Sequence, residues 1–154
     1  MKTRSIVLTM VLCLAGLAVS FADNPNIGTW KLNEAKSKIP AGAMKNTTVV
    51  YTADGDKVKC TTDGTGSDGK PMHTEWTGQF DGKDYPVTGD PSADSRSYTK
   101  INEHTLALAN KKDGKVHISG RIVVSADGKT RTLTTSTKNA EGKKLTSTAV
   151  YDKE

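Results

Sequence analysis

The amino-acid sequence predicts an all-β protein: an antiparallel up-and-down meander of short strands that closes into a barrel. Two patterns support this prediction. Turn dipeptides recur along the chain, and the segments between them alternate between apolar and polar residues. Gly adopts the positive φ that tight hairpin turns require, and Asp tolerates it. The turn dipeptides are Asp-Gly at 54–55, 63–64, 68–69, 81–82, 113–114 and 127–128, and Glu-Gly at 141–142.

The segments between these turns are rich in Thr, Val, Ile, Tyr and Trp, the residues that favour pleated strands. In the clearest case Met72, Trp76 and Phe80 share one face, while His73 and Glu75 share the other. One turn of helix is expected within 34–44. The expected strands are 28–33, 46–53, 57–62, 71–80, 95–101, 104–111, 115–125, 129–138 and 144–152, with a short one near 84–88.

A closed barrel of about 8 to 10 strands is favoured over a two-sheet sandwich. Closure leaves no strand edge exposed to solvent. A protein with a small core cannot easily protect an exposed edge in other ways. Apolar residues make up 34% of the chain, and Thr fills many strand positions instead. A sandwich needs a dry apolar interface, whereas a barrel tolerates a polar lumen.

Residues 1–22 have the pattern of a Sec-type signal peptide. Lys2 and Arg4 precede an apolar run over 6–19, which is shorter than the roughly 20 residues that cross a bilayer, and small residues precede a cleavage point before Asp23. We therefore expect one β-barrel domain over 23–154, exported to the periplasm or the outside of a bacterial cell. Cys60 would be its single cysteine, so no intramolecular disulfide is expected.

Several classes of function are disfavoured by the sequence. The formal net charge is +5, and the lysines are scattered through turns rather than clustered, which does not indicate nucleic-acid binding. The strands are too short and too rich in Lys for a protein embedded in a membrane. His73 and Glu75 are interpreted as solvated strand residues rather than metal ligands. We expect no enzyme activity, no catalytic residues, no cofactor and no metal, and the sequence does not indicate an oligomeric state.

The two ends of the domain resemble a known group of barrels. The sequence Gly-Thr-Trp-Lys-Leu at 28–32 resembles the first strand of calycins, which include lipocalins, fatty-acid-binding proteins and avidins. The sequence at 148–153 is similar to the last strand of fatty-acid-binding proteins. The whole domain also resembles a group of uncharacterised exported bacterial proteins. The resemblance implies a calycin-like barrel in which Gly28 and Trp30 are structural, with Trp30 plugging the closed end.

The last strand departs from this resemblance at one position. Fatty-acid-binding proteins hold the ligand carboxylate with an Arg of that strand and the Tyr two residues later. Here Ala149 stands in place of the Arg, while Tyr151 remains. A carboxylate clamp would therefore need a substitute cation, and Arg96 and Arg131 are the candidates.

The expected function is non-enzymatic binding of a small, partly apolar ligand, hydrophobic or amphiphilic, inside a lipocalin-like barrel. The alternative is a filled barrel without a ligand, which acts through surface contacts with another envelope or extracellular protein, for example as an inhibitor. The volume of the lumen separates the two, since ligand sites typically enclose roughly 300 Å³ or more. The residues expected to line the pocket are Tyr51, Trp76, Phe80, Arg96, Tyr98, Leu108, Ile118, Arg131 and Tyr151.

Overall fold

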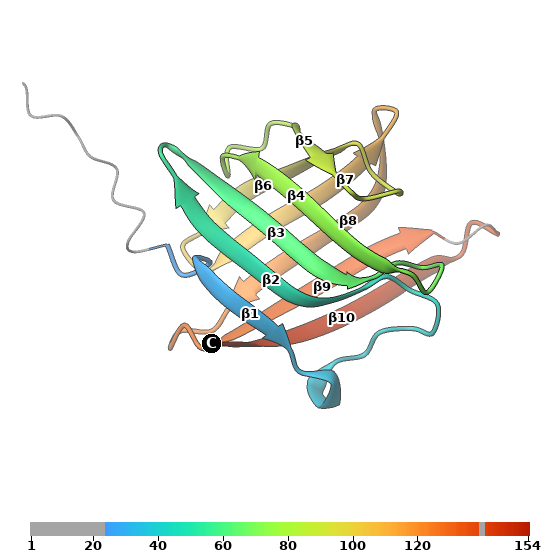
Figure 1. The fold of residues 1–154 in the computed structure, drawn as a ribbon, viewed down its shortest axis with the longest axis horizontal. Helices are drawn as coiled ribbons and strands as arrows, with labels where there is room; N and C mark the ends of the chain where they lie inside the picture. The colour runs from blue at the N-terminus through green and yellow to red at the C-terminus, as the bar shows by residue number, and fades with distance from the viewer. Residues whose placement is uncertain (1–23, 139–140) are drawn as a thin grey trace, which may run out of the picture.

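The computed structural model describes residues 24–138 and 141–154, so the expected signal peptide lies outside the described residues. The described chain forms one closed antiparallel barrel, and the all-β meander predicted from the sequence is confirmed (Figure 1). Its strands are β1 (Gly28–Leu32), β2 (Lys45–Asp54), β3 (Lys57–Thr65), β4 (Pro71–Gly78), β5 (Tyr85–Thr88), β6 (Ser95–Asn102), β7 (Thr105–Lys112), β8 (Lys115–Val124), β9 (Thr130–Lys138) and β10 (Lys144–Lys153).

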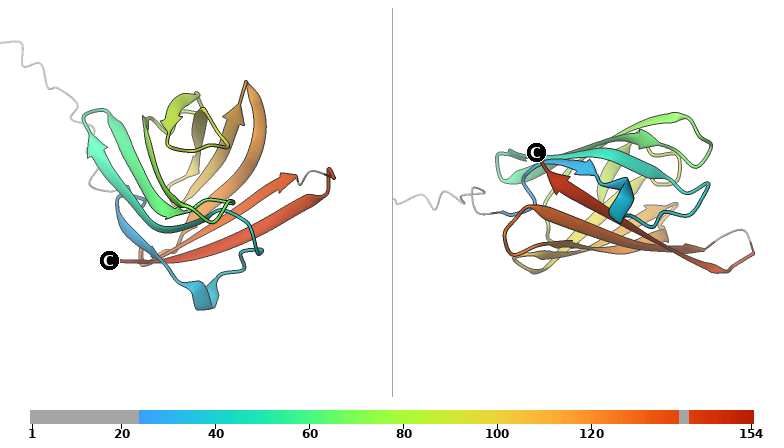
Figure 2. Two further views of the ribbon diagram at one scale, coloured as in Figure 1. Left: turned by 45° about the vertical axis from the view of Figure 1, so that its right-hand side comes forward. Right: turned by 90° about the horizontal axis from the view of Figure 1, so that it is seen from below.

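Each strand pairs with its neighbours in sequence, and β1 closes the ring by pairing with β10 as well as with β2. Trp30 of β1 lies opposite Val49 of β2 on one side and opposite Lys153 of β10 on the other. The strands wrap around a central space, and the β9–β10 hairpin extends past its neighbours (Figure 2).

The local elements follow the predicted pattern with two differences. The expected helical turn is a short 3₁₀ helix, η2 (Glu34–Lys36), whose N-terminus is capped by the Asn33 side chain. The second difference concerns the dipeptide at 63–64, which was expected to form a turn and instead lies inside β3. Gly64 passes so close to β2 that a Cβ at this position would collide with the Lys45 carbonyl oxygen. Close backbone contact, and not a turn, explains this glycine.

Because neighbouring strands run in opposite directions, the connections gather at two ends of the barrel. The end that holds the start of β1 and the end of β10 is called the floor, and the opposite end, with the long 33–44 connection, is called the mouth. In the described part of the chain, no helix has the length and apolar character needed to cross a bilayer.

Aromatic side chains fill the floor half of the lumen. Trp76 stacks on Phe80 with ring centroids 6.3 Å apart and meets the edge of Tyr98 at 4.8 Å. Tyr51 contacts both Phe80 and Tyr98 in edge-to-face geometry. These rings are packed against one another, so the floor half of the barrel is closed to solvent.

Candidate functional site

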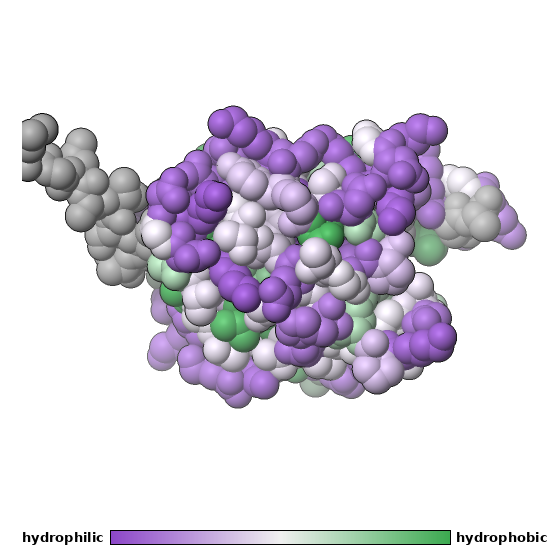
Figure 3. Space-filling model, turned by 45° about the horizontal axis from the view of Figure 1, so that its top comes forward, coloured by the Kyte–Doolittle hydropathy of each residue, from purple (hydrophilic) through white to green (hydrophobic). Residues whose placement is uncertain are grey.

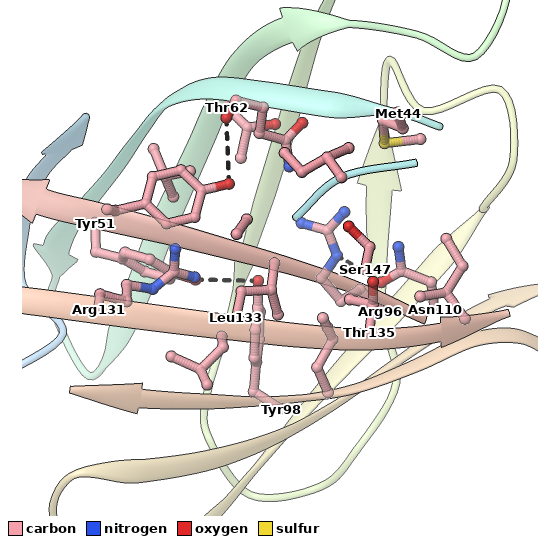
Figure 4. A pocket seen from close by; sticks show the side chains of 18 residues that line it. Met44, Tyr51, Thr62, Arg96, Tyr98, Asn110, Arg131, Leu133, Thr135 and Ser147 are labelled. Carbon is pink, nitrogen blue, oxygen red and sulfur yellow. Dashed lines mark hydrogen bonds between the residues drawn. The ribbon is translucent and has the colours of Figure 1, made fainter. Parts of the chain in front are cut away.

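A cavity of about 90 Å³ lies within the lumen, between the aromatic floor and the mouth (Figure 4). Seven of the nine residues expected to line a pocket do line it, and they come from β2, β6, β7, β8, β9 and β10. The seven are Tyr51, Arg96, Tyr98, Leu108, Ile118, Arg131 and Tyr151. Face alternation along each strand therefore located seven of the eighteen residues that line the cavity.

The other two expected lining residues, Trp76 and Phe80, lie outside this cavity, because they pack into the aromatic floor. The two residues expected to be structural lie near the closed end. Trp30 is fully buried, and its indole N–H donates to the Asn26 carbonyl at 2.9 Å. Gly28 has φ +130° and lies against Lys153, whose ammonium in turn lies 5.0 Å from the centre of the Trp30 ring.

A second cavity, of about 350 Å³, opens toward the mouth. It has a small-residue wall, Pro40 to Ala43, and an apolar residue of β10, Leu145. The two cavities share the lining residues Met44, Ile118, Thr135 and Ser147, so they adjoin. The enclosed cavity alone is smaller than a typical ligand site, whereas the mouth cavity exceeds the roughly 300 Å³ typical of one. The lumen is thus filled near the floor and hollow toward the mouth.

Arg131 is the most deeply buried charge along this path, with 2% of its surface exposed. It begins β9 and lies directly opposite Tyr151 of β10. Its guanidinium group stands between two rings, with its carbon atom 5.2 Å from the centre of Tyr51 and 5.2 Å from the centre of Tyr151. One Nη2 hydrogen is donated to the Tyr51 hydroxyl at 3.0 Å.

The remaining donors of Arg131 are not satisfied. Its Nε and Nη1 atoms are buried without a hydrogen-bond partner, and no carboxylate among the described residues pairs with it. Burial raises the pKa of Tyr51 and of Tyr151 above the ordinary value, so both phenols are neutral at neutral pH. Neutral phenols orient the guanidinium group without balancing its charge.

Arg96, the second candidate cation, is bound differently. Its Nε atom donates to the Asn110 side chain at 2.8 Å, and its Nη2 atom lies 3.5 Å from a carboxylate oxygen of Asp90. The Asp90 side chain is fully buried in the connection between β5 and β6. Figure 4 shows Arg96 beside Asn110 and well separated from Arg131. The charge of Arg96 is therefore balanced within the protein.

Tyr98 lines the cavity, and Cys60 lies beside the lining residues Tyr51 and Tyr98. Burial raises the pKa of Cys60 and of Tyr98, so both are neutral at neutral pH, and the Tyr51 hydroxyl donates to the Tyr98 oxygen at 3.2 Å. Five polar lining residues were not predicted from the sequence, namely Asn46, Thr62, Asn110, Thr135 and Ser147. Asn110 follows the alternation of Leu106 and Leu108 and could have been found, whereas Asn46 could not, because a β-bulge changes the face it occupies.

Comparison with known proteins supports the fold. No family model matches the chain, and no curated protein matches it in sequence. The chain is similar to the structure of EF1p2_mFAP2b bound to DFHBI, with 12% identity and a TM-score of 0.51 over 88% of this chain and 100% of that one. It is also similar to the redesigned β-barrels mFAP1, bound to DFHBI (17%, TM-score 0.44, covering 87% and 100%), and b11L5F_LGL (13%, TM-score 0.43, covering 89% and 98%). The first likeness supports the closed antiparallel β-barrel fold.

Proposed function

We propose that this barrel binds a small, partly apolar organic acid without transforming it, and that Arg131 holds the acid's carboxylate. The observation that carries the proposal is the unbalanced guanidinium group at the inner end of the cavity. A buried charge without a partner is strongly unfavourable in a protein interior. A carboxylate offers the missing negative charge, and a guanidinium group with unused N–H donors can bind it through two parallel hydrogen bonds.

The position of Arg131 fits this role on the calycin pattern. Ala149 stands where fatty-acid-binding proteins have an Arg, and Arg131 lies directly across the β9–β10 pair from Tyr151. The cation is thus supplied by the neighbouring strand, while the tyrosine stays in place. We propose on this basis that the chain is a member of the lipocalin and fatty-acid-binding group of calycins.

The apolar part of the ligand would extend from Arg131 toward the mouth. Val49, Leu133 and Ala149 line the enclosed cavity, and Ile118 and Met44 line both cavities. This order, with the charge deepest and the apolar surface outward, suits a ligand with one acidic end and a short apolar tail. EF1p2_mFAP2b has a similar fold and is bound to DFHBI, so it is an example of such a barrel with a small molecule bound.

The test compares two arginine variants for the binding of decanoate by isothermal titration calorimetry at neutral pH. Arg131→Met should weaken binding at least about 30-fold, which corresponds to roughly 2 kcal/mol, because the carboxylate then lacks its cation. Arg121→Met, at an exposed arginine of β8 outside both cavities, is the matched control and should change the affinity less than about threefold. Equal affinity of Arg131→Met and the wild type, or no binding of decanoate by the wild type at micromolar concentration, would refute the proposal.

The filled barrel that acts through surface contacts is the second candidate, and the small volume of the enclosed cavity favours it. Native mass spectrometry of protein purified from its own host distinguishes the two. A co-purified organic acid supports the ligand site, and an empty barrel with a stoichiometric protein partner supports the second candidate.

We also propose that the protein is exported to the periplasm or beyond, from the signal-peptide pattern of residues 1–22. The intact mass of the exported protein should correspond to a chain that begins at Asp23. A mass that retains the first 22 residues would contradict export by this route.

A further inference from the structure

We propose that the acid carries a hydrogen-bond donor, such as a hydroxyl group, close to its carboxylate, and that the side-chain oxygen of Asn46 accepts from it. This inference rests on the proposed function and specifies the ligand class of the same site. It depends on a separate observation, since Asn46 lies on β2 and takes no part in the contacts of Arg131.

A β-bulge turns Asn46 into the lumen. The pairing of β2 with β3 shifts between Asn46 and Thr48, which leaves Thr47 as the extra residue. Without this shift, strict alternation from the buried Val49 would place Thr47 inside and Asn46 outside. In the structure Thr47 is exposed and Asn46 lines the enclosed cavity. Gly64, opposite Asn46, allows the two backbones to approach at the bulge.

The side-chain oxygen of Asn46 is a buried acceptor without a partner. Buried polar atoms are nearly always hydrogen-bonded, so an orphan acceptor on a residue that lines a cavity points to a group supplied by a ligand. Arg131, whose Nε and Nη1 donors have no partner, lines the same cavity. The site therefore offers donors for an anion and, separately, an acceptor for a hydroxyl or N–H group.

Tyr151 contacts both Arg131 and Asn46. Its ring faces the Arg131 guanidinium carbon at 5.2 Å, and its hydroxyl donates to the backbone carbonyl of Asn46 at 3.2 Å. Arg131 and Asn46 thus lie on either side of one tyrosine. A ligand that reaches both must carry its donor within a few bonds of its carboxylate, as a 3-hydroxy acid does.

An acid without such a donor would leave the Asn46 oxygen unpaired in the complex. A site built to bind a hydroxyl group discriminates strongly against an analogue that lacks it, because the buried acceptor then loses both water and partner. Thr135 and Ser147 lie opposite each other in the β9–β10 pair and line both cavities. The lining that leads from Asn46 toward the mouth therefore begins with polar side chains.

The test measures the affinities of octanoate and of each enantiomer of 3-hydroxyoctanoate by isothermal titration calorimetry. The wild type should prefer one enantiomer over octanoate by at least about tenfold. In Asn46→Leu this preference should fall below about threefold, while the affinity for octanoate stays the same or rises. Thr47→Val, at the outward-facing neighbour, is the matched control and should keep the wild-type preference.

The outcomes separate this inference from the proposed function. If the wild type binds octanoate and both hydroxy acids equally, or if Asn46→Leu keeps the preference, the role of Asn46 is refuted while the acid site stands. If the wild type binds none of these acids, the proposed function itself fails. Circular dichroism checks that Asn46→Leu is folded, and Asn46→Ala provides the same comparison if leucine unfolds the barrel.

Discussion

Arg96 and Arg131 are two buried guanidinium groups in one lumen, and their surroundings assign them different roles. Arg96 is tied to the buried Asp90, which is itself held by the backbone N–H and hydroxyl groups of Ser92. This ion pair spans 3.5 Å without a hydrogen bond, and it joins the β5–β6 connection to a side chain of β6. Among the residues that the structure describes, Arg131 has aromatic neighbours but no anion, so its charge is unbalanced.

This difference predicts opposite effects on stability and on binding. Arg96→Met should lower the free energy of unfolding by about 3 to 5 kcal/mol, because it leaves the Asp90 carboxylate buried without a partner. Arg131→Met should cost clearly less, since it removes a charge that has no counter-ion. Urea unfolding of the two ligand-free variants at neutral pH measures both values. A larger loss in Arg131→Met than in Arg96→Met would contradict this assignment.

At the level of strands and turns, the sequence predicted the regular parts of the molecule well. All ten expected segments are strands, because turn residues and two-residue alternation are local properties that a sequence displays directly. The dipeptide at 63–64 was misinterpreted because the same glycine serves a turn or a close backbone contact. Only the pairing of β3 with β2 shows which of these applies.

The candidate site was predicted in part for the same reason. Alternation identifies which side chains point inward, and seven of the nine expected residues line the cavity. Alternation does not indicate how deeply an inward residue packs, so Trp76 and Phe80 could not be separated from the true lining. Nor does it reveal which of two arginines has an acidic partner, because Asp90 lies in a connection outside the alternating segments.

The bulge in β2 gives a prediction for Gly64. Gly64→Ala should lower the free energy of unfolding by more than about 2 kcal/mol, since the added Cβ collides with the backbone of Lys45. Gly114→Ala is the control: that glycine has φ +72° but open space around a Cβ, so only the strain of about 1 to 2 kcal/mol applies. Chemical denaturation of both variants gives the comparison, and equal losses would show that β3 does not need a glycine here.

The barrel as a whole depends on the closure of its ring beside Trp30. β1 has only five residues, yet it joins β2 to β10, and Trp30 fills the floor between them. Trp30 is completely buried, and its calycin-like role of plugging the closed end stays a prediction.

We predict that Trp30→Ala costs about 3 to 5 kcal/mol, the usual loss for a fully buried aromatic residue, and more than Leu108→Ala in the lining of the cavity. The reason is that Leu108 borders empty volume, whereas Trp30 is packed on all sides. The midpoint of urea unfolding measures the ranking. If the midpoint of Trp30→Ala equals that of the wild type, the proposed structural role of Trp30 is wrong.

The outer surface bears on the choice between the two candidate functions. The face shown in Figure 3 is mostly hydrophilic, with hydrophobic residues in small separate spots. Protein–protein contact sites are commonly marked by larger contiguous apolar patches. On this face, the surface therefore offers less support to a contact function than the lumen offers to a ligand.

Closure by β1 and β10 also sets the order of events when the chain folds. Neighbouring strands can zip together as soon as their shared turn forms, on the microsecond scale of hairpins. The contact between Trp30 and Lys153 joins positions at opposite ends of the domain, so it carries the largest loop entropy and slows folding. Until this contact forms, β1 and β10 have unpaired edges, and the lumen is open to solvent. We therefore expect the cavity that Arg131 lines to close only in the final step of folding.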